Sequence, residues 1–158
     1  LNPPVYHTST YLERKKHMSK IAIVYWSGTG NTEAMARLVE EGGNAAGGQA
    51  DLLTPELFDP SMVGNYTAFA FGCPSMGAEQ LEEAEFEPMF SAVKPNLSGK
   101  TIGLFGSYGW GDGEWMRTWQ ADCEEAGCSL AEEPVICCGA PEGDAADACR
   151  SLGRALAK

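Results

Sequence analysis

The sequence predicts an α/β fold in which one parallel β-sheet lies between two layers of helices. Short and mostly unbroken apolar runs recur along the chain, as expected of strands covered on both faces. Segments with helical spacing separate these runs, and such alternation indicates right-handed crossovers between parallel strands. Three stretches of unusual composition follow predicted strands, at the sheet edge where α/β proteins bind ligands.

The predicted strands are the apolar runs bounded by polar or turn-forming residues. Each run is only a few residues long, which suits a strand better than a helix. In chain order, the five runs are I-A-I-V-Y (21–25), A-D-L-L-T (50–54), Y-T-A-F-A-F-G (66–72), K-T-I-G-L-F-G (100–106) and P-V-I-C-C (134–138).

The predicted helices show apolar residues three and four positions apart. A weaker candidate covers residues 56–64, where Asp59-Pro60 interrupts the pattern. The clear sets are Ala34, Leu38 and Val39; Phe86, Met89, Phe90 and Val93; Trp115, Trp119, Cys123 and Ala126; and Ala145, Ala148, Leu152 and Leu156.

Length and composition predict one compact domain. The chain has 158 residues, of which 44% are hydrophobic and 21% charged, enough for a proper core. Residues 1–17 carry two prolines and clustered cations without a sustained period, so we expect a disordered leader or a cloning remnant there. The domain is expected over 18–158. Both histidines, His7 and His17, fall in the leader, which argues against a histidine-based catalytic site.

The net charge of −11 bears on partners and location. Such an excess of acid disfavours a nucleic-acid surface and favours encounters with a basic partner, although solubility alone is the simpler explanation. No apolar stretch reaches the roughly 18 residues of a membrane span, and no signal peptide is evident. A soluble, cytoplasmic protein is therefore expected. The acid gathers in one short stretch at Glu79, Glu82, Glu83, Glu85 and Glu87.

The six cysteines do not match a metal or redox motif. None forms C-x-x-C, and their spacing fits neither a zinc nor an iron–sulfur ligand set. Reduced, partly buried thiols and no metal site are expected of such a cytosolic chain. These cysteines are Cys73, Cys123, Cys128, Cys137, Cys138 and Cys149.

The stretch S-G-T-G-N-T (27–32) follows the first predicted strand and predicts an uncharged anion site. Gly28 and Gly30 allow a tight turn whose N–H groups converge, and a helix beginning near Asn31 adds its dipole. The stretch lacks the lysine of a P-loop and the third glycine of a dinucleotide fingerprint. A phosphate monoester therefore fits better than a triphosphate or pyrophosphate. The alternative is a hydroxyl-rich N-cap turn without a ligand.

Two further stretches supply walls for a planar ligand. In G-S-Y-G-W-G-D-G-E-W (106–115), Tyr108 and Trp110 lie among glycines, so an aromatic ring can stay exposed for stacking. In G-C-P-S-M-G-A-E (72–79), Met76 can cover the opposite face and Glu79 can accept an imide N–H. Core packing is the alternative for Trp110 and Met76.

Together these motifs resemble the short-chain flavodoxins of anaerobic, clostridial-type bacteria. The similarity in S-G-T-G-N-T-E-A-M-A, G-C-P-S-M-G-A-E-Q-L-E, F-E-P-M-F and G-L-F-G-S-Y-G-W-G-D-G-E-W-M covers nearly all of 18–158. The resemblance implies a flavodoxin-like three-layer sandwich with a five-stranded parallel sheet of order 2-1-3-4-5. It also implies a monomeric carrier that holds one FMN non-covalently and moves between oxidised, semiquinone and hydroquinone states, at low potential and without substrate turnover.

The resemblance also implies roles for individual residues. Ser27 to Thr32 would bind the phosphate, Trp110 and Met76 would cover the two ring faces, and Glu79 would meet the N3–H. The Gly77 carbonyl would turn toward N5 on reduction. The implied cofactor-binding residues are Ser27, Gly28, Thr29, Gly30, Asn31, Thr32, Ser75, Met76, Gly77, Ala78, Glu79, Ser107, Tyr108, Gly109, Trp110 and Gly111.

Ala78 departs from the family, whose members often carry a polar residue or glycine at that position. A four-residue turn from Met76 to Glu79 needs positive φ at Ala78 in one form and at Gly77 in the other. Because alanine resists positive φ, the form with Gly77 in that region is expected. The loop C-C-G-A-P-E-G-D (137–144) leaves its ring contacts open.

Other functions are less consistent with the sequence. A flavin-dependent NAD(P)H or quinone oxidoreductase would need a pocket for a second substrate, and no segment supplies one. A phosphoacceptor module would need acidic residues after the first strand, which ends Y-W-S. An FMN-storage or structural role would differ only in lacking partners. The acidic residues Glu79, Glu82, Glu83 and Glu85 would rim the flavin edge and orient redox proteins with basic docking surfaces.

Overall fold

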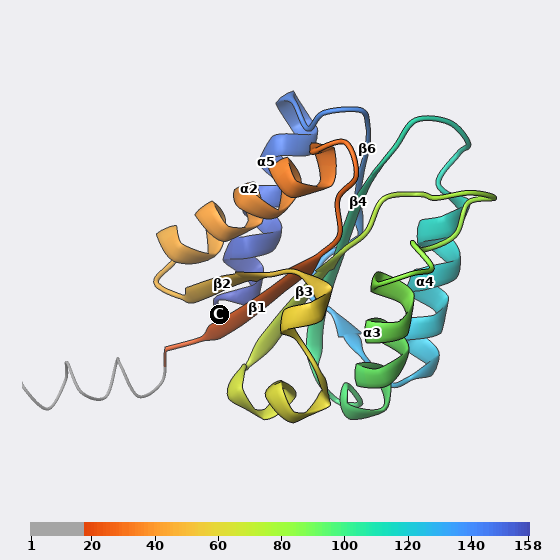
Figure 1. Cartoon of the computed structure of the whole chain (residues 1–158). Coiled ribbons are helices and arrows are strands. Elements are labelled where there is room, and N and C mark those ends of the chain that lie inside the picture. The colour runs from red at the N-terminus through yellow and green to blue at the C-terminus, as the bar shows by residue number, and fades with distance from the viewer. Residues whose placement is uncertain (1–17) are drawn as a thin grey trace, which may run out of the picture.

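A computed structural model describes residues 18–158 and contains a six-stranded parallel sheet with helices on both faces (Figure 1). The predicted leader, 1–17, lies outside the described residues. The strands are β1 (Lys20–Tyr25), β2 (Gln49–Leu53), β3 (Ala68–Gly72), β4 (Thr101–Tyr108), β5 (Ser129–Leu130) and β6 (Val135–Cys138). The helices are α2 (Asn31–Ala45), α3 (Phe86–Val93), α4 (Glu114–Glu125) and α5 (Gly143–Leu156), with 3-10 turns at Pro55–Leu57, Pro60–Asn65 and Lys94–Asn96.

The sheet has the strand order β2-β1-β3-β4, and both β5 and β6 pair with β4 at its edge. The predicted order 2-1-3-4-5 is therefore confirmed. The fifth predicted strand, 134–138, corresponds to β6, and the two-residue β5 is a small addition. The fifth position of the sheet is shared, because β5 pairs with the start of β4 and β6 with its end. The two-residue β5 was missed because two residues are too few to show a hydrophobic pattern.

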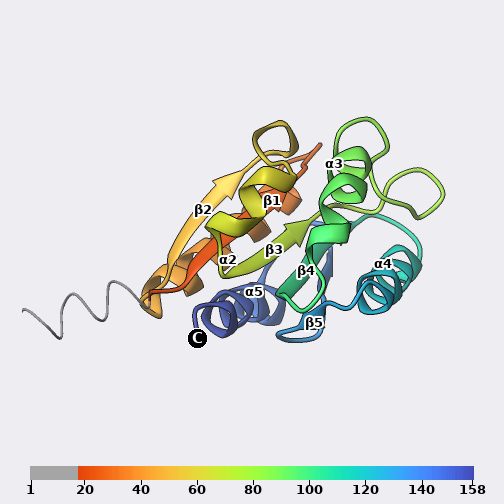
Figure 2. The same ribbon diagram turned by 90° about the horizontal axis from the view of Figure 1, so that it is seen from below.

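Two helices cover each face of the sheet, with α2 and α5 on one side and α3 and α4 on the other (Figure 2). Alternate residues of β1 explain this: Ala22 and Val24 join the core under α3 and α4, whereas Ile21 and Ile23 join the core under α2 and α5. Every one of these side chains is fully buried. The apolar runs are thus continuous because both faces are covered, as predicted.

The weak helix candidate at 56–64 is replaced by two separate 3-10 turns, Pro55–Leu57 and Pro60–Asn65. Asp59 caps the second turn, accepting a hydrogen bond of 2.8 Å from the backbone N–H of Ser61. Pro60 has no N–H and restricts the conformation of the residue before it, so a continuous helix cannot run through this point.

The cysteines lie within the fold as free thiols, four of them buried. Burial raises the pKa of Cys73, Cys123 and Cys149 to about 12. Such thiols are inert as nucleophiles, because the thiolate is the reactive form. Within 18–158, no group of acidic, histidine or cysteine side chains has the arrangement of a metal site, and no helix is long and apolar enough to cross a membrane.

Candidate functional site

The three stretches singled out in the sequence meet at the carboxyl edge of the sheet, where they surround a pocket of about 270 Å³. They arrive there because β1, β3 and β4 are parallel neighbours and each stretch lies at the carboxyl end of one of these strands. The lining residues are Trp26, Gly28, Thr29, Asn31, Thr32, Pro74, Ser75, Met76, Ser107, Tyr108, Gly109 and Gly139.

The first stretch forms a tight loop that leads into α2. Gly30 stands at the N-cap with φ of 99°, a left-handed conformation that favours glycine. The Ser27 hydroxyl oxygen accepts hydrogen bonds from the backbone N–H groups of Gly30, at 3.1 Å, and Glu33, at 3.2 Å. Ser27 therefore holds the loop against the start of the helix. This is the capping role that the sequence left open, and Ser27 performs it next to the pocket.

Four backbone N–H groups of this loop remain available to a ligand. Those of Gly28, Thr29, Asn31 and Thr32 have no hydrogen-bond partner among residues 18–158, and all four residues line the pocket. Unpaired N–H groups at a helix N-terminus attract an anion, because the helix dipole adds to their own partial charges. The loop contains no Lys or Arg, so it offers a neutral cup to a phosphate monoester.

Hydrogen bonds connect the loop to the other two walls of the pocket. Thr32 is only 1% exposed, and its hydroxyl oxygen accepts the Ser107 backbone N–H at 3.4 Å. The Thr32 hydroxyl hydrogen is then free to be donated to a ligand. The Ser107 hydroxyl donates at 2.6 Å to the carbonyl oxygen of Gly139, after β6. The end of β6 is thereby fixed to the same site.

The second stretch forms a hairpin turn rather than the expected four-residue turn. Met76 and Gln80 exchange two backbone hydrogen bonds, of 2.8 and 2.9 Å, so the turn closes one residue later than predicted. Gly77 has φ of 52° and Glu79 has φ of 53°, whereas Ala78 is outside the left-handed region. The expected placement of positive φ on Gly77 is correct. The extra residue is accommodated by a second left-handed position, at Glu79.

Glu79 and Trp110 do not line the pocket. Glu79 lies against the loop that carries Trp110. The Glu79 carboxylate accepts the backbone N–H of Glu114 at 3.1 Å, at the first residue of α4. A side chain at Gly111 would collide with this carboxylate, at 2.6 Å. Trp110 is 63% exposed, so one face of its ring is open to a stacking partner. The expected contacts of both residues with a flavin ring stay predictions.

Several of the expected residues do not line the pocket. Nine of the sixteen do, namely Gly28, Thr29, Asn31, Thr32, Ser75, Met76, Ser107, Tyr108 and Gly109. Two others support the first loop from behind, Ser27 as its cap and Gly30 as the N-cap of α2. The remaining five, Gly77, Ala78, Glu79, Trp110 and Gly111, belong to the turn and loop that adjoin each other beyond the pocket.

Three pocket residues were not predicted from the sequence: Trp26, Pro74 and Gly139. Trp26 comes directly after β1. A large aromatic residue next to the anion loop could have indicated from the sequence that it lines the pocket. The tip of its ring packs within 3.2–3.3 Å of where a side chain on Gly28 would begin. Gly139 belongs to the cysteine-rich loop, whose composition alone did not reveal which residue faces the ligand.

The expectation that Glu82 belongs to an acidic rim around the flavin edge was wrong. Glu82 was predicted to be an exposed charge at the flavin edge, but it is only 7% exposed and caps the start of α3. Its carboxylate accepts the backbone N–H groups of Ala84, at 2.8 Å, Glu85, at 2.7 Å, and Phe86, at 2.8 Å. Burial by itself raises the pKa of Glu82, but these three donors outweigh it and hold the pKa below its ordinary value. The sequence contained no standard capping pattern at this position.

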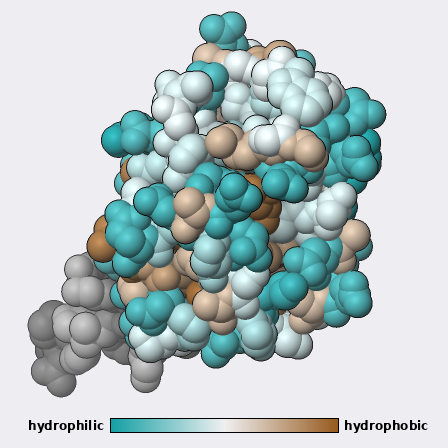
Figure 3. Space-filling model, turned by 45° about the vertical axis from the view of Figure 1, so that its right-hand side comes forward, coloured by the Kyte–Doolittle hydropathy of each residue, from teal (hydrophilic) through white to brown (hydrophobic). Residues whose placement is uncertain are grey.

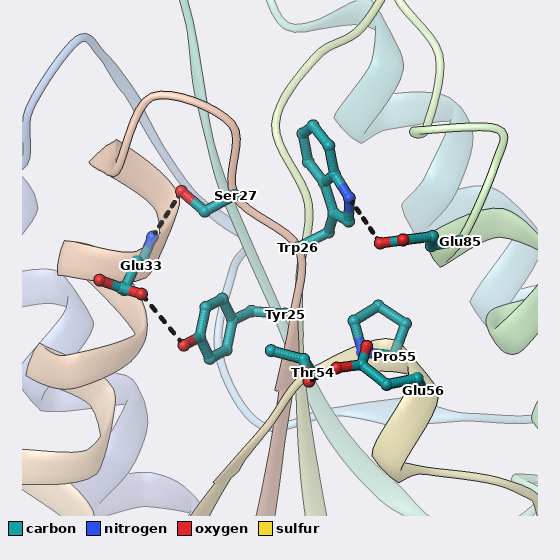
Figure 4. A pocket seen from close by; sticks show the side chains of 8 residues that line it. All are labelled: Tyr25, Trp26, Ser27, Glu33, Thr54, Pro55, Glu56 and Glu85. Carbon is teal, nitrogen blue, oxygen red and sulfur yellow. Dashed lines mark hydrogen bonds between the residues drawn. The ribbon is translucent and has the colours of Figure 1, made fainter.

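A second cavity, of about 480 Å³, adjoins the anion loop on the side of β2 (Figure 4). The Trp26 indole N–H donates to the Glu85 carboxylate at 3.1 Å, and the Tyr25 hydroxyl donates to the Glu33 carboxylate at 3.3 Å (Figure 4). Burial and the Glu33 carboxylate raise the pKa of Tyr25. Carboxylates dominate this cavity, which makes it unsuited to a phosphate and leaves the first pocket as the anion site.

Comparisons with known proteins agree with this geometry. The family model described as Flavodoxin matches residues 23–153. A flavodoxin of Megasphaera elsdenii is 43% identical over 138 residues, covering 87% of this chain and 98% of the relative. A flavodoxin of Clostridium beijerinckii is 41% identical over 135 residues, covering 85% of this chain and 97% of the relative.

The solution structure of two-electron reduced Megasphaera elsdenii flavodoxin superimposes with a TM-score of 0.80 at 44% identity, covering 87% of this chain and 98% of that chain. The family-model match over residues 23–153 includes the anion loop, the hairpin turn and the aromatic loop. Flavodoxins are FMN-dependent electron-transfer proteins rather than enzymes. This chain therefore belongs to the flavodoxin family, in the short-chain group represented by these anaerobic bacteria, and its cofactor is FMN.

Proposed function

We propose that this protein is a low-potential one-electron carrier that holds FMN non-covalently and passes electrons between redox proteins, using three redox states of the flavin. The four unpaired N–H groups at Gly28, Thr29, Asn31 and Thr32 carry this proposal, because they form a neutral cup for the FMN 5′-phosphate. FMN supplies the one-electron chemistry when bound, and the protein supplies its binding and electrostatic surroundings.

The remaining cofactor contacts follow the layout of the site. Met76 lines the pocket and is proposed to cover one face of the ring system, while the exposed Trp110 covers the other. Glu79 is proposed to accept the ring N3–H, and the backbone around Gly77 to adjust to the ring N5. Because Glu79 already accepts the Glu114 N–H, a flavin there would share a carboxylate that is held in place.

The low potential is proposed to arise from the acidic surroundings. An electron added to the flavin creates negative charge, which nearby carboxylates disfavour, and the protein itself carries a net charge of −11. The same charge is proposed to attract redox proteins with basic docking surfaces. We further propose that residues 18–158 form a single, monomeric FMN-binding domain that works in the cytoplasm. The six free cysteines support a reducing compartment.

A reductive titration tests the proposal. The purified protein is loaded with FMN, and its absorption spectrum is followed during stepwise addition of dithionite. We expect one FMN per chain and two separated one-electron steps. A protein that cannot take up FMN, or that takes up both electrons in one step, would contradict the proposed carrier.

A further inference from the structure

A groove of about 720 Å³ lies between the segment 79–87 and α4, on the face opposite α2 and α5. It is separate from the flavin pocket, with which it shares no lining residue. We call it the acidic groove. It is lined by Glu79, Gln80, Leu81, Glu83, Glu87, Trp115, Thr118, Trp119, Ala121, Asp122 and Glu125.

Carboxylates stand on both walls of the acidic groove. Glu83 and Glu87 lie on one wall, and Asp122 and Glu125 rise from α4 on the other. Lys94 pairs with Asp122 at 3.0 Å, but no cation among residues 18–158 pairs with Glu79, Glu83, Glu87 or Glu125. The groove thus keeps most of its negative charge for an incoming partner. Figure 3 turns this side of the molecule forward, and hydrophilic residues there surround small recessed hydrophobic areas.

The floor of the acidic groove is apolar and holds an unpaired polar atom. Leu81, Trp115 and Trp119 contribute to the floor. Trp119 is 2% exposed and stands edge-to-face against Phe86 and Phe90, yet its indole N–H has no hydrogen-bond partner within 18–158. Buried donors of this kind are normally satisfied, so this N–H gains a partner only if the side chains around it move when an occupant binds.

Given the electron-carrier function proposed above, we propose that the acidic groove is the docking site for an amphipathic, basic segment of a redox partner. An apolar side chain of that segment would rest on Leu81 and Trp119, and Lys or Arg side chains on either side of it would pair with the two acidic walls. If the side chains around Trp119 shift on binding, a backbone carbonyl of the same segment can accept its N–H, which is buried in the free protein. The carboxylates on both walls exclude an acidic or phosphorylated partner from the groove.

The acidic groove is coupled to the flavin site by two contacts. Trp115, at its floor, packs against Tyr108 with ring centroids 5.6 Å apart, and Tyr108 lines the flavin pocket. Glu79 lines the groove and lies within the turn that Met76 and Gln80 close, and Met76 is a residue of the flavin pocket. The ring pair of Trp115 and Tyr108 would therefore lie between a partner in the groove and the cofactor.

The test compares two double variants with the same change in net charge. Glu83→Gln with Glu125→Gln neutralises one carboxylate on each wall of the groove. Glu124→Gln with Glu133→Gln neutralises two exposed carboxylates outside it, one of them next to Glu125 on the same helix. Each FMN-loaded protein is reduced and mixed with a basic c-type cytochrome as the probe. The second-order rate constant of electron transfer is measured at low and at high salt.

At low salt, we expect the double variant in the groove to lose about fivefold in the rate constant of electron transfer, because two ion pairs at a partly exposed interface are weakened. The control double variant should lose less than about twofold. High salt should remove the difference, because it screens exposed charges. A third variant, Ala121→Lys, places a cation in the groove and should slow the reaction at least as much as the groove double.

Equal losses in the two doubles would overturn the proposal, because they would indicate steering by net charge alone. Unchanged rates in both, or in Ala121→Lys, would overturn it too. If sedimentation of the loaded protein shows a dimer that only the groove double dissociates, the occupant is a second copy of this chain and the proposal is wrong. A wild-type protein that binds no FMN would instead refute the carrier function, before any variant is compared.

Discussion

Replacing Glu82 with glutamine should destabilise the protein and change how its stability depends on pH. The native carboxylate accepts three backbone N–H groups at 2.7–2.8 Å, with one oxygen serving Ala84 and the other serving both Glu85 and Phe86. A glutamine of the same length has one acceptor oxygen. Its NH₂ group must face at least one of the three N–H donors, which then loses its partner in a buried place.

The size of the effect follows from these contacts. A lost hydrogen bond to a charged group costs about 1.5–3 kcal/mol, and loss of a negative charge at a helix N-terminus adds about 0.3–1 kcal/mol. We therefore expect Glu82→Gln to lower the free energy of unfolding by about 2–4 kcal/mol at neutral pH, a sizeable part of a typical domain's stability.

The sign of the pH effect follows from the pKa of Glu82. Its pKa is lowered in the folded protein, so its stabilising contribution is complete above the ordinary value of 4.5 and disappears as the pH falls through the lower folded value. The glutamine variant has no such titration. The gap in stability between the two proteins should therefore narrow below pH 4.5.

Urea unfolding with excess FMN, followed by tryptophan fluorescence, measures the gap at pH 7 and at several lower values. The matched control is Glu83→Gln, which removes the same charge from an exposed neighbour and should change stability by less than about 0.5 kcal/mol. If the Glu82→Gln gap is as small as that of the control, or stays the same at every pH, the capping argument is refuted.

Three further predictions concern the flavin site. Thr29→Val should weaken FMN about tenfold or more while leaving riboflavin affinity unchanged, because only FMN has the phosphate that the hydroxyl would meet; fluorescence titrations with both ligands decide this, and equal losses would refute the phosphate assignment. Gly77→Ala should lower the free energy of unfolding, measured by heat or urea, by about 1–2 kcal/mol, because φ is 52° there and alanine resists this left-handed conformation. Ala78→Gly should not raise stability, since Ala78 does not have positive φ. A stabilising Ala78→Gly together with a neutral Gly77→Ala would contradict the observed turn. Trp26→Phe removes the 3.1 Å hydrogen bond to Glu85 but keeps an aromatic ring next to the anion loop, so FMN affinity should change less than about threefold. Trp26→Ala also removes the ring and should weaken FMN binding further. Identical FMN affinities for the two variants would show that the ring plays no part in FMN binding.

The fold was largely predictable because the strands are buried on both faces. Unbroken runs such as I-A-I-V-Y then appear directly in the sequence, and the helical spacing of Trp115 and Trp119 placed both on the buried face of α4. The short β5 was not predictable, and neither was the exact length of the turn after Met76. That turn depends on hydrogen bonds with Gln80, whose side chain gives no sign of them.

The candidate site was predictable where composition itself carries the chemistry. A loop as rich in glycine and hydroxyl residues as 27–32 is typical of an anion site, and its unpaired N–H groups are where they were expected. Charge was a poorer guide to position. Glu82 belongs to the same acidic stretch as Glu83, yet one is a buried cap and the other lines a groove, because exposure depends on the path of the backbone.

The anion loop would hold the FMN phosphate with main-chain N–H groups and without a cation. No charge of the loop therefore offsets the negative charge of the phosphate. A bound FMN phosphate adds about 1.5–2 negative charges at pH 7 to a chain whose net charge is already −11. The loaded protein should consequently bind an anion-exchange column more tightly than the same chain without FMN, and a salt gradient should separate the two. The N–H groups favour the dianion and so lower the pKa of the bound phosphate below its ordinary value of about 6, and protonation at such lower pH would bring the two elution positions closer together.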